Sequence, residues 1–183
     1  MQLANSNARY GAVPQLVHWL TALFVICGWL LGTFLDDIPK GPPRAFGLAA
    51  HMTLGQCVFV LVLVRLIWRH ANPPPAPEKT RFGKALEVIA KLNHYLLYAL
   101  LIAVPLLGVF VQLKRGNALP VFGFGGLPSP WPADRTTARV ILRVHEVCAD
   151  ALLILAGVHA GAALVHHYVF RDRTLARMLP GAA

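Results

Sequence analysis

Four long apolar runs constrain the fold of this chain more than any other feature of its sequence. They cover residues 16–35, 45–64, 92–113 and 144–170. Each of the first three contains one histidine and no Lys, Arg, Asp or Glu, whereas the fourth contains four histidines and two carboxylates. About twenty apolar residues in a helix span a hydrocarbon core of roughly 30 Å. The runs therefore predict an all-α protein, an integral membrane bundle of four transmembrane helices.

The overall composition agrees with a membrane environment. Of the 183 residues, 56% are hydrophobic and only 14% are charged, whereas about a quarter of the residues in a soluble domain are charged. The net charge of +9 raises the question of a nucleic-acid partner. The Lys and Arg residues form no stripe, however, but stand in short groups between the apolar runs, as in membrane loops. We therefore expect contact with membrane lipid and no binding of nucleic acid.

Segments rich in proline and glycine separate the apolar runs. We expect one membrane domain over residues 1–183, with helices at about residues 13–35, 45–69, 84–113 and 137–170. The longest connection, "KRGNALPVFGFGGLPSPWPADRTT", follows the third helix and is a candidate lid over the mouth of the bundle. No internal repeat is apparent in the sequence.

The distribution of Lys and Arg predicts how the bundle is oriented in the membrane. The side with the termini and the second connection, which we call the inner side, carries ten of the 17 basic residues: Arg9, Arg65, Arg69, Lys79, Arg81, Lys84, Lys91, Arg171, Arg173 and Arg177. The outer side carries the other seven: Lys40, Arg44, Lys114, Arg115, Arg135, Arg139 and Arg143. Because basic loops stay in the cytoplasm, this bias predicts that both termini are cytoplasmic.

Four intramembrane histidines fall at two depths. His145 and His159 are fourteen residues apart on the fourth helix, so they share a face within roughly 40° and differ in depth by about 21 Å. His51 lies near the outer end of the second helix and His18 near the inner end of the first. The four histidines therefore form an outer pair, His51 and His145, and an inner pair, His18 and His159. A single intramembrane histidine serves in packing as often as in function, but two pairs at matched depths favour a functional role.

Two histidines that face each other from neighbouring helices can bind a haem iron axially, because neutral imidazole is a good iron ligand. Two levels of such pairs predict two stacked haems. Small residues beside the histidines, with Gly55 and Gly161 as the main candidates, would leave room for the cofactor. Ordinary packing of membrane helices also uses small residues. That second explanation applies equally to Gly28 and Gly32, which are four residues apart in "GWLLG".

Five segments carry a resemblance to a known family. They are "LVHWL", "AAHMTLG", "KRGN", "RVHE" and "VHAGAALVHHYVFRDRTLARMLP", and together they extend over nearly the whole chain. In these segments the chain resembles the bacterial cytochrome b561 family. The resemblance implies a four-helix inner-membrane protein that binds two haems b. Carried over residue by residue, it also implies His18, His51, His145 and His159 as the axial ligands, in agreement with the pairing by depth.

The resemblance also implies a function, because members of this family pass electrons between a donor and the quinone pool. The similarity is closest to the superoxide oxidase branch, which oxidises superoxide to dioxygen at the outer face and reduces ubiquinone. A basic outer mouth would attract the superoxide anion. The basic residues available there are Lys114, Arg115, Arg135, Arg139 and Arg143, with Arg115, Arg139 and Arg143 as the main candidates. Binding of lipid headgroups is an equally good reason for these basic residues.

His166 follows His159 by seven residues, on nearly the same helix face and about 10 Å further inward. We predict that it binds the quinone and donates a proton. An interfacial histidine pair beside Tyr168 is the alternative interpretation. The sequence assigns no role to His94 or His167. A second function also remains open, that of an electron-relay or membrane-anchor cytochrome b subunit with a separate redox partner protein.

Overall fold

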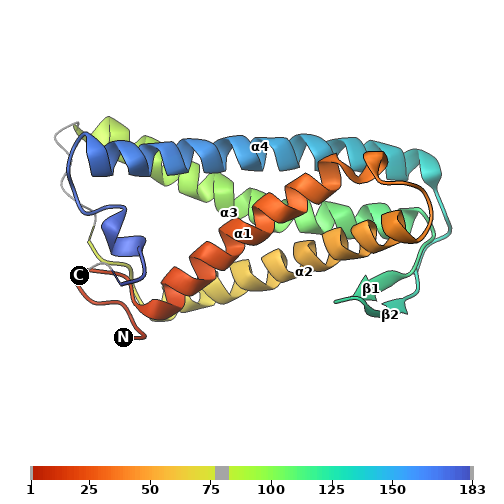
Figure 1. Ribbon diagram of the computed structural model, residues 1–183, viewed down its shortest axis with the longest axis horizontal. Coiled ribbons are helices and arrows are strands. Elements are labelled where there is room, and N and C mark those ends of the chain that lie inside the picture. Colours follow the sequence, from red (N-terminus) through yellow and green to blue (C-terminus); the bar gives the residue numbers. More distant parts are fainter. Residues whose placement is uncertain (1, 77–82, 182–183) are drawn as a thin grey trace.

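Four long helices form the protein (Figure 1). The computed structural model describes residues 2–76 and 83–181. The helices are α1 (Ala12–Thr33), α2 (Pro42–Ala71), α3 (Gly83–Lys114) and α4 (Arg135–Tyr168). All four are long and apolar enough to cross a membrane. The predicted bundle of four helices capable of spanning a membrane is therefore present.

The helices run alternately up and down along the bundle. Both termini lie at one end, together with the end of α2 and the start of α3, and the connection between α3 and α4 lies at the opposite end (Figure 1). We call these ends inner and outer, as in the sequence analysis. The arrangement places the termini on one side of the membrane, while their cytoplasmic location stays a prediction. Lys79 and Arg81, which were counted toward the inner side, lie outside the described residues.

All four helices begin before the apolar runs that predict them. For α2 and α4 the reason is that the residues that start or cap the helix are not themselves apolar. α2 begins at Pro42, directly after Gly41 with a φ of 106°, and proline is favourable in the first turn of a helix. α4 begins after Asp134, whose side chain accepts hydrogen bonds from the N–H groups of Thr136 and Thr137. Hydrogen bonds from the Thr137 hydroxyl and backbone hold the pKa of Asp134 below its ordinary value.

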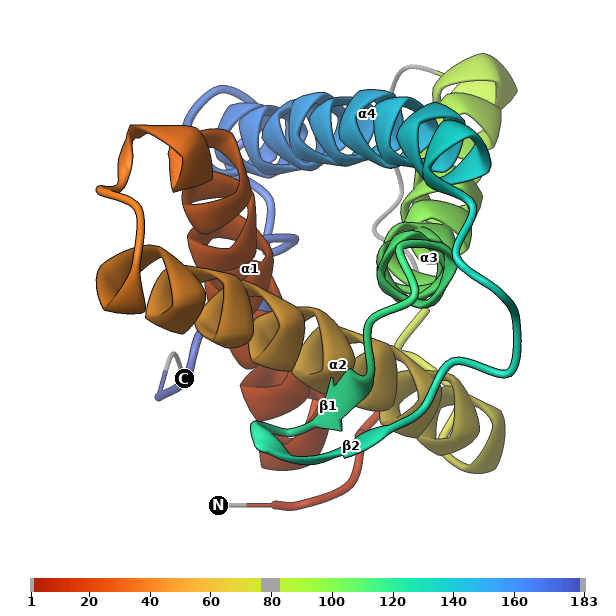
Figure 2. The same ribbon diagram turned by 90° about the vertical axis from the view of Figure 1, so that its right-hand side faces the viewer.

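A small β-hairpin adds strand structure to the predicted all-α fold. β1 (Leu119–Val121) pairs antiparallel with β2 (Phe124–Leu127) in the outer connection. The side-chain amide of Gln56 on α2 donates to the carbonyl of Pro120 at 2.6 Å and accepts from the N–H of Phe122 at 2.7 Å. The hairpin therefore lies over α2 at one side of the bundle (Figure 2), instead of across the mouth as the predicted lid would.

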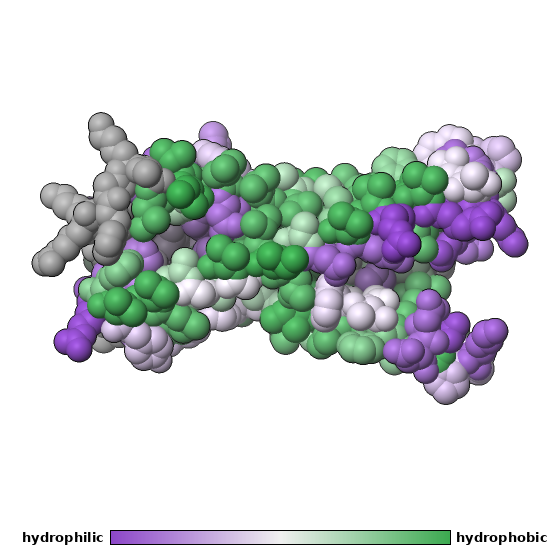
Figure 3. Space-filling model, turned by 90° about the horizontal axis from the view of Figure 1, so that it is seen from above, coloured by the Kyte–Doolittle hydropathy of each residue, from purple (hydrophilic) through white to green (hydrophobic). Residues whose placement is uncertain are grey.

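Apolar side chains are exposed along most of the bundle, as expected for a protein surrounded by lipid. A compact cluster of buried residues, formed by Val58, Val62, Leu101 and Leu152, joins α2, α3 and α4. Figure 3 shows hydrophobic side chains over the middle of one face and hydrophilic ones gathered toward the outer end. The cluster lies in the middle of the bundle, at a depth between the outer and the inner histidine pairs.

Candidate functional site

The outer histidine pair lies between α2 and α4. The ring centroids of His51 and His145 are 6.1 Å apart, with an angle of 76° between the ring planes. Nδ1 of His51 donates to the carbonyl of Gly28 at 2.8 Å, and Nδ1 of His145 donates to the carbonyl of Val104 at 2.9 Å. Because a carbonyl only accepts, these bonds place the proton on Nδ1 and leave the Nε2 lone pair of each ring available to a metal.

A glycine lies against each ring of the outer pair. A Cβ atom added to Gly32 would come within 2.9 Å of Cε1 of His51, and one added to Gly108 within 3.4 Å of Cε1 of His145. Each glycine stands four residues after the carbonyl that holds the same ring, since Gly28 precedes Gly32 and Val104 precedes Gly108. The spacing of Gly28 and Gly32 therefore serves the docking of His51 onto α1.

The same arrangement occurs twice, once in the α1–α2 hairpin and once in the α3–α4 hairpin. The equivalent positions are His18 and His94, Gly32 and Gly108, His51 and His145, and Arg65 and His159. In the first helix of each hairpin, the glycine follows the histidine by 14 residues: 18 and 32 in one hairpin, 94 and 108 in the other. In the second helix, the equivalent positions are again 14 residues apart: 51 and 65, and 145 and 159. An internal repeat is therefore present, contrary to the sequence analysis, which missed it because most of the repeated positions hold different apolar residues.

The inner pair has the same separation as the outer one but different neighbours. The ring centroids of His18 and His159 are 6.2 Å apart, again at 76°. His94 lies edge-on to His159, with centroids 4.9 Å apart. The guanidinium of Arg65 lies 3.1 Å from Nδ1 of His18. The structure therefore gives His94 a place beside the inner pair, and it adds Arg65, which the sequence analysis had counted only as a basic residue.

The separation of the rings in both pairs suits a haem bound between two histidines. Two imidazoles that bind one iron from opposite sides, with metal–nitrogen bonds of about 2 Å, hold their ring centroids about 6 Å apart. In the part of the chain that the structure describes, no group of three or more His, Cys, Asp or Glu side chains could hold a bare metal ion. The pairs therefore fit a cofactor that brings its own equatorial ligands.

Gly55 and Gly161 face open space. A Cβ atom added to either residue would meet no heavy atom within 4 Å, apart from its chain neighbours and its own helix backbone. Packing between protein elements therefore does not explain why these positions are glycine. Gly55 lies one turn from His51, which agrees with the prediction that it leaves room for a cofactor. Gly161 lies two residues after His159, on nearly the opposite face of α4, so its position gives no such support.

His166 is held by a carboxylate at the inner end of α4. Its Nδ1 donates to Oδ2 of Asp172 at 2.5 Å, and both side chains are about four-fifths buried, with exposed fractions of 18% and 20%. Oδ1 of Asp172 accepts from the N–H of Thr174 at 2.8 Å. Partial burial acts to raise the pKa of Asp172, but the hydrogen bonds from His166 and Thr174 together outweigh it and lower that pKa. His167 instead lies edge-on to Tyr168.

Two of the three predicted outer arginines meet at one place. A hollow of about 470 Å³, which we call the outer hollow, is lined by Arg115, Asn117, Arg135, Ala138 and Arg139. Arg143 does not line it. Its guanidinium lies 3.5 Å from the carboxylate of Glu146, one turn along α4. The structure therefore separates Arg143 from Arg115 and Arg139, and it keeps Arg135, another of the basic residues expected at the outer mouth, beside them.

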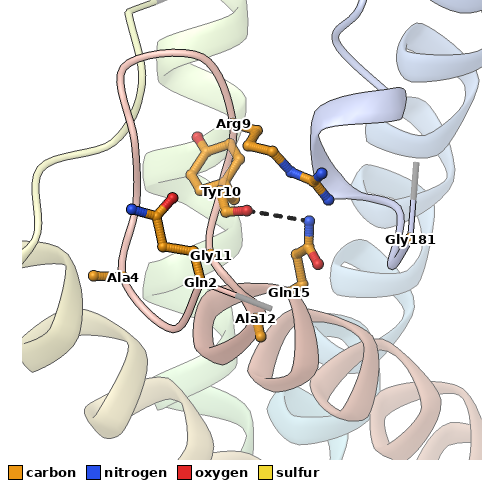
Figure 4. Close-up of a pocket in the computed structure, with 8 residues that line it drawn as sticks. All are labelled: Gln2, Ala4, Arg9, Tyr10, Gly11, Ala12, Gln15 and Gly181. Atoms are coloured by element: carbon orange, nitrogen blue, oxygen red, sulfur yellow. Dashed lines mark hydrogen bonds between the residues drawn. The ribbon is translucent and has the colours of Figure 1, made fainter. Parts of the chain in front are cut away.

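A second hollow, at the inner end, lies between the N-terminal segment, the start of α1 and Gly181 (Figure 4). Gln15 donates to the carbonyl of Tyr10 at 3.2 Å and closes one side of it. The hollow has a volume of about 190 Å³, below the roughly 300–1,000 Å³ of ordinary small-molecule sites. His166 is not among its lining residues, and we assign it no ligand.

The fold places this chain among membrane-spanning four-helix bundles, and its two facing histidine pairs fit a redox cofactor. Residues 9–181 match the family model of prokaryotic cytochrome b561. The chain belongs to this family, whose members are membrane cytochromes that bind haem b and transfer electrons.

Individual relatives cover almost the whole chain. Cytochrome b561 homolog 1 of Escherichia coli (strain K12) is 34% identical over 180 residues, which are 94% of this chain and 97% of that protein. The probable superoxide oxidase CybB of Yersinia pestis is 30% identical over 176 residues, or 95% and 97% of the two chains. Cytochrome b562 of Cereibacter sphaeroides is 32% identical over 175 residues, or 93% and 94%. The similarity therefore extends beyond the histidines to all four helices.

Gly32, which lies against the ring of His51, leads to a prediction in which the size of the effect follows the distance to the ring. Gly32→Ala places a methyl group 2.9 Å from Cε1 of His51, and we expect it to lower the haem content of the purified protein and to cost about 1–3 kcal/mol of stability. Gly108→Ala, with a distance of 3.4 Å, should have a smaller effect of the same kind. Gly28→Ala is the control, because its methyl group would meet Cβ of Leu54 at an ordinary 3.9 Å. Equal haem content in all three variants would contradict this explanation of the glycines.

Proposed function

We propose that this chain is a di-haem cytochrome b that passes electrons from superoxide at the outer face, through two haems b, to ubiquinone. In the complete reaction, two superoxide anions each lose one electron and become dioxygen. One ubiquinone gains these two electrons and two protons and becomes ubiquinol. The site of this reaction would be a bacterial inner membrane, with both termini in the cytoplasm and the product entering the quinone pool.

The observation that carries the proposal is the presence of two histidine pairs, each about 6 Å between ring centroids, at two depths of one bundle. His51 and His145 would hold the outer haem, and His18 and His159 the inner one. A haem b supplies one-electron chemistry at its iron. With two histidines of this chain on each haem, the chain would offer no position at which a substrate binds iron.

The outer hollow supports superoxide as the donor. Arg115, Arg135 and Arg139 place three positive charges around it, and a positively charged concave surface raises the local concentration of a small anion. The relative from Yersinia pestis that is named a probable superoxide oxidase supports the same donor. Oxidation of superoxide requires no proton at this end of the bundle, so attraction and exclusion of competing cations are all that these residues need to provide.

The pair of His166 and Asp172 supports quinone reduction at the inner end. Asp172 fixes the ring of His166 through Nδ1, which leaves Nε2 to face a bound molecule. A histidine can both hydrogen-bond a quinone oxygen and hand it a proton.

Rapid mixing of the purified protein with superoxide tests the proposed function. We expect reduction of both haems upon mixing, followed by one ubiquinol for every two superoxide anions consumed when ubiquinone is present. Absence of haem reduction would overturn the proposal. If a redox protein that co-purifies with the chain reduces the haems instead, the chain is an electron-relay subunit.

The outer hollow predicts that the rate of haem reduction by superoxide depends on the positive charge around it. Replacing both Arg115 and Arg139 with glutamine should lower the second-order rate of haem reduction by superoxide about tenfold at low ionic strength, because electrostatic attraction accelerates encounter. The difference from the unmodified protein should shrink as salt is added. Lys40→Gln removes one charge from the same end, outside the hollow, and serves as the control. A double variant no slower than the Lys40 variant would rule out attraction by the hollow.

A further inference from the structure

Arg65 is a charged residue inside the second membrane-spanning helix. It follows the apolar stretch "VFVLVLV" and lies half-buried at the level of the inner histidine pair. Its guanidinium contacts Nδ1 of His18 at 3.1 Å and lies over the ring of Tyr98 at 5.6 Å from the centroid. Among the described residues, no carboxylate lies within ion-pair distance of it. An arginine stays protonated in any protein environment, so a positive charge at this depth is stabilised best by a nearby anion.

Trp68 presents a second donor without an acceptor. Its indole N–H is buried and finds no hydrogen-bond partner within the described part of the chain. Trp68 follows Arg65 by three residues, so the two side chains lie on one face of α2, one turn apart in depth. One helix face therefore offers a guanidinium fork and an indole N–H, both of which suit carboxylate oxygens.

The contact between Arg65 and His18 also conflicts with binding of iron. Arginine is only a donor, so Nδ1 of His18 accepts in this contact and the ring proton belongs on Nε2. The outer pair shows the opposite arrangement: each ring carries its proton on Nδ1, and its Nε2 lone pair is free. For His18 to bind iron through Nε2, the proton has to move to Nδ1, and two donors would then face each other. Arg65 must therefore find another acceptor when the haem is bound.

We propose that Arg65 and Trp68 bind the propionate carboxylates of the inner haem. This inference rests on the proposed assignment of that haem to His18 and His159. The propionates are the only anions that the cofactor itself brings, and Arg65 already touches one of its axial ligands. The internal repeat agrees with a role for Arg65 at the cofactor. Arg65 holds the position in the first hairpin that His159, a proposed iron ligand, holds in the second.

Conservative variants test the inference on the holoprotein. In Arg65→Gln we expect the inner haem to have a lower midpoint potential, because loss of a nearby positive charge favours the oxidised form, and to be lost about ten times more readily in detergent. Arg65→Lys keeps the charge without the fork, and Trp68→Phe keeps the ring without the N–H. Both should retain two haems and shift the carboxylate stretch of the propionates in redox-induced infrared difference spectra.

Arg69→Gln is the matched control, because Arg69 is an exposed arginine one turn further along α2. In this variant the midpoint potential of the inner haem and the infrared difference spectrum should match those of the unmodified protein. An unchanged potential and carboxylate band in the Arg65 and Trp68 variants would overturn the inference. A change confined to phosphate bands would overturn it in favour of a lipid headgroup. Haem count and ubiquinol formation in the unmodified protein are measured separately, and failure there would overturn the proposed function itself.

Discussion

Replacing His51 or His145 with alanine is expected to remove one of two haems from the purified protein and to leave the other in place. The two rings face each other at 6.1 Å, and each is held by a different helix through its own carbonyl partner. Loss of either ring leaves an iron with a single protein ligand, so both variants should lose the same haem. The haem-to-protein ratio, measured by optical spectroscopy after reduction, should fall by about half.

The inner pair provides the matched comparison. His18→Ala and His159→Ala should remove the other haem, so that the four variants form two groups with two distinct residual spectra. His94→Ala is the control that separates ligation from proximity, because His94 lies even closer to His159, at 4.9 Å between centroids. It should keep both haems. Loss of the inner haem in the His94 variant, together with its retention in the His18 variant, would mean that the inner pair is His94 and His159.

The pairing of the histidines by depth could be predicted from the sequence because helix geometry is regular. Fourteen residues fix both the face and the separation of His145 and His159, and alternation of the helices places His51 and His18 at the matching ends. The structure brings both pairs to about 6 Å between centroids. The ligand assignment itself stays a prediction that the haem-loss experiment decides.

The carbonyl groups and glycines that hold these histidine rings could not be predicted from sequence patterns, because they come from other helices. The carbonyl groups of Gly28 and Val104 carry no residue-specific signal, and which helix face they lie on depends on packing. Gly108 was detectable only through its 14-residue distance from His94, which repeats that of Gly32 from His18. Such a repeat is hard to see when the intervening positions need only to be apolar.

Charged side chains show the same limit at the outer end. The sequence places Arg139 and Arg143 one turn apart on one helix, which suggested a common role. In the structure Glu146 lies close enough to Arg143 to pair with it, while the start of α4 brings Arg135 and Arg139 to Arg115 at the end of α3. Position along one helix predicts neighbours on that helix, but a site between helices depends on how their ends meet.

His166→Leu is expected to slow reduction of ubiquinone by about 100-fold, the scale of a lost general acid, while haem reduction by superoxide and the haem spectrum stay unchanged. The side chain lies seven residues beyond His159 and is positioned by Asp172, so its loss removes a proton donor without disturbing an iron ligand. His167→Leu is the matched control, because His167 packs against Tyr168 instead. Equal quinone kinetics in the His166 and His167 variants would rule out the proton-donor role.

Asp172→Asn should produce a different result, a change in pH dependence. The pKa of Asp172 is lowered in the folded protein, so its carboxylate is charged at neutral and mildly acidic pH. The stability that it contributes is present above its ordinary pKa and is lost only as the pH falls through the lower folded value. The melting temperature of the Asp172→Asn variant should therefore lie below that of the unmodified protein at neutral pH, with two haems still bound. The difference should vanish as the pH falls through the folded pKa of Asp172. Equal melting temperatures at neutral pH would show that the carboxylate adds no stability through its contacts with His166 and Thr174.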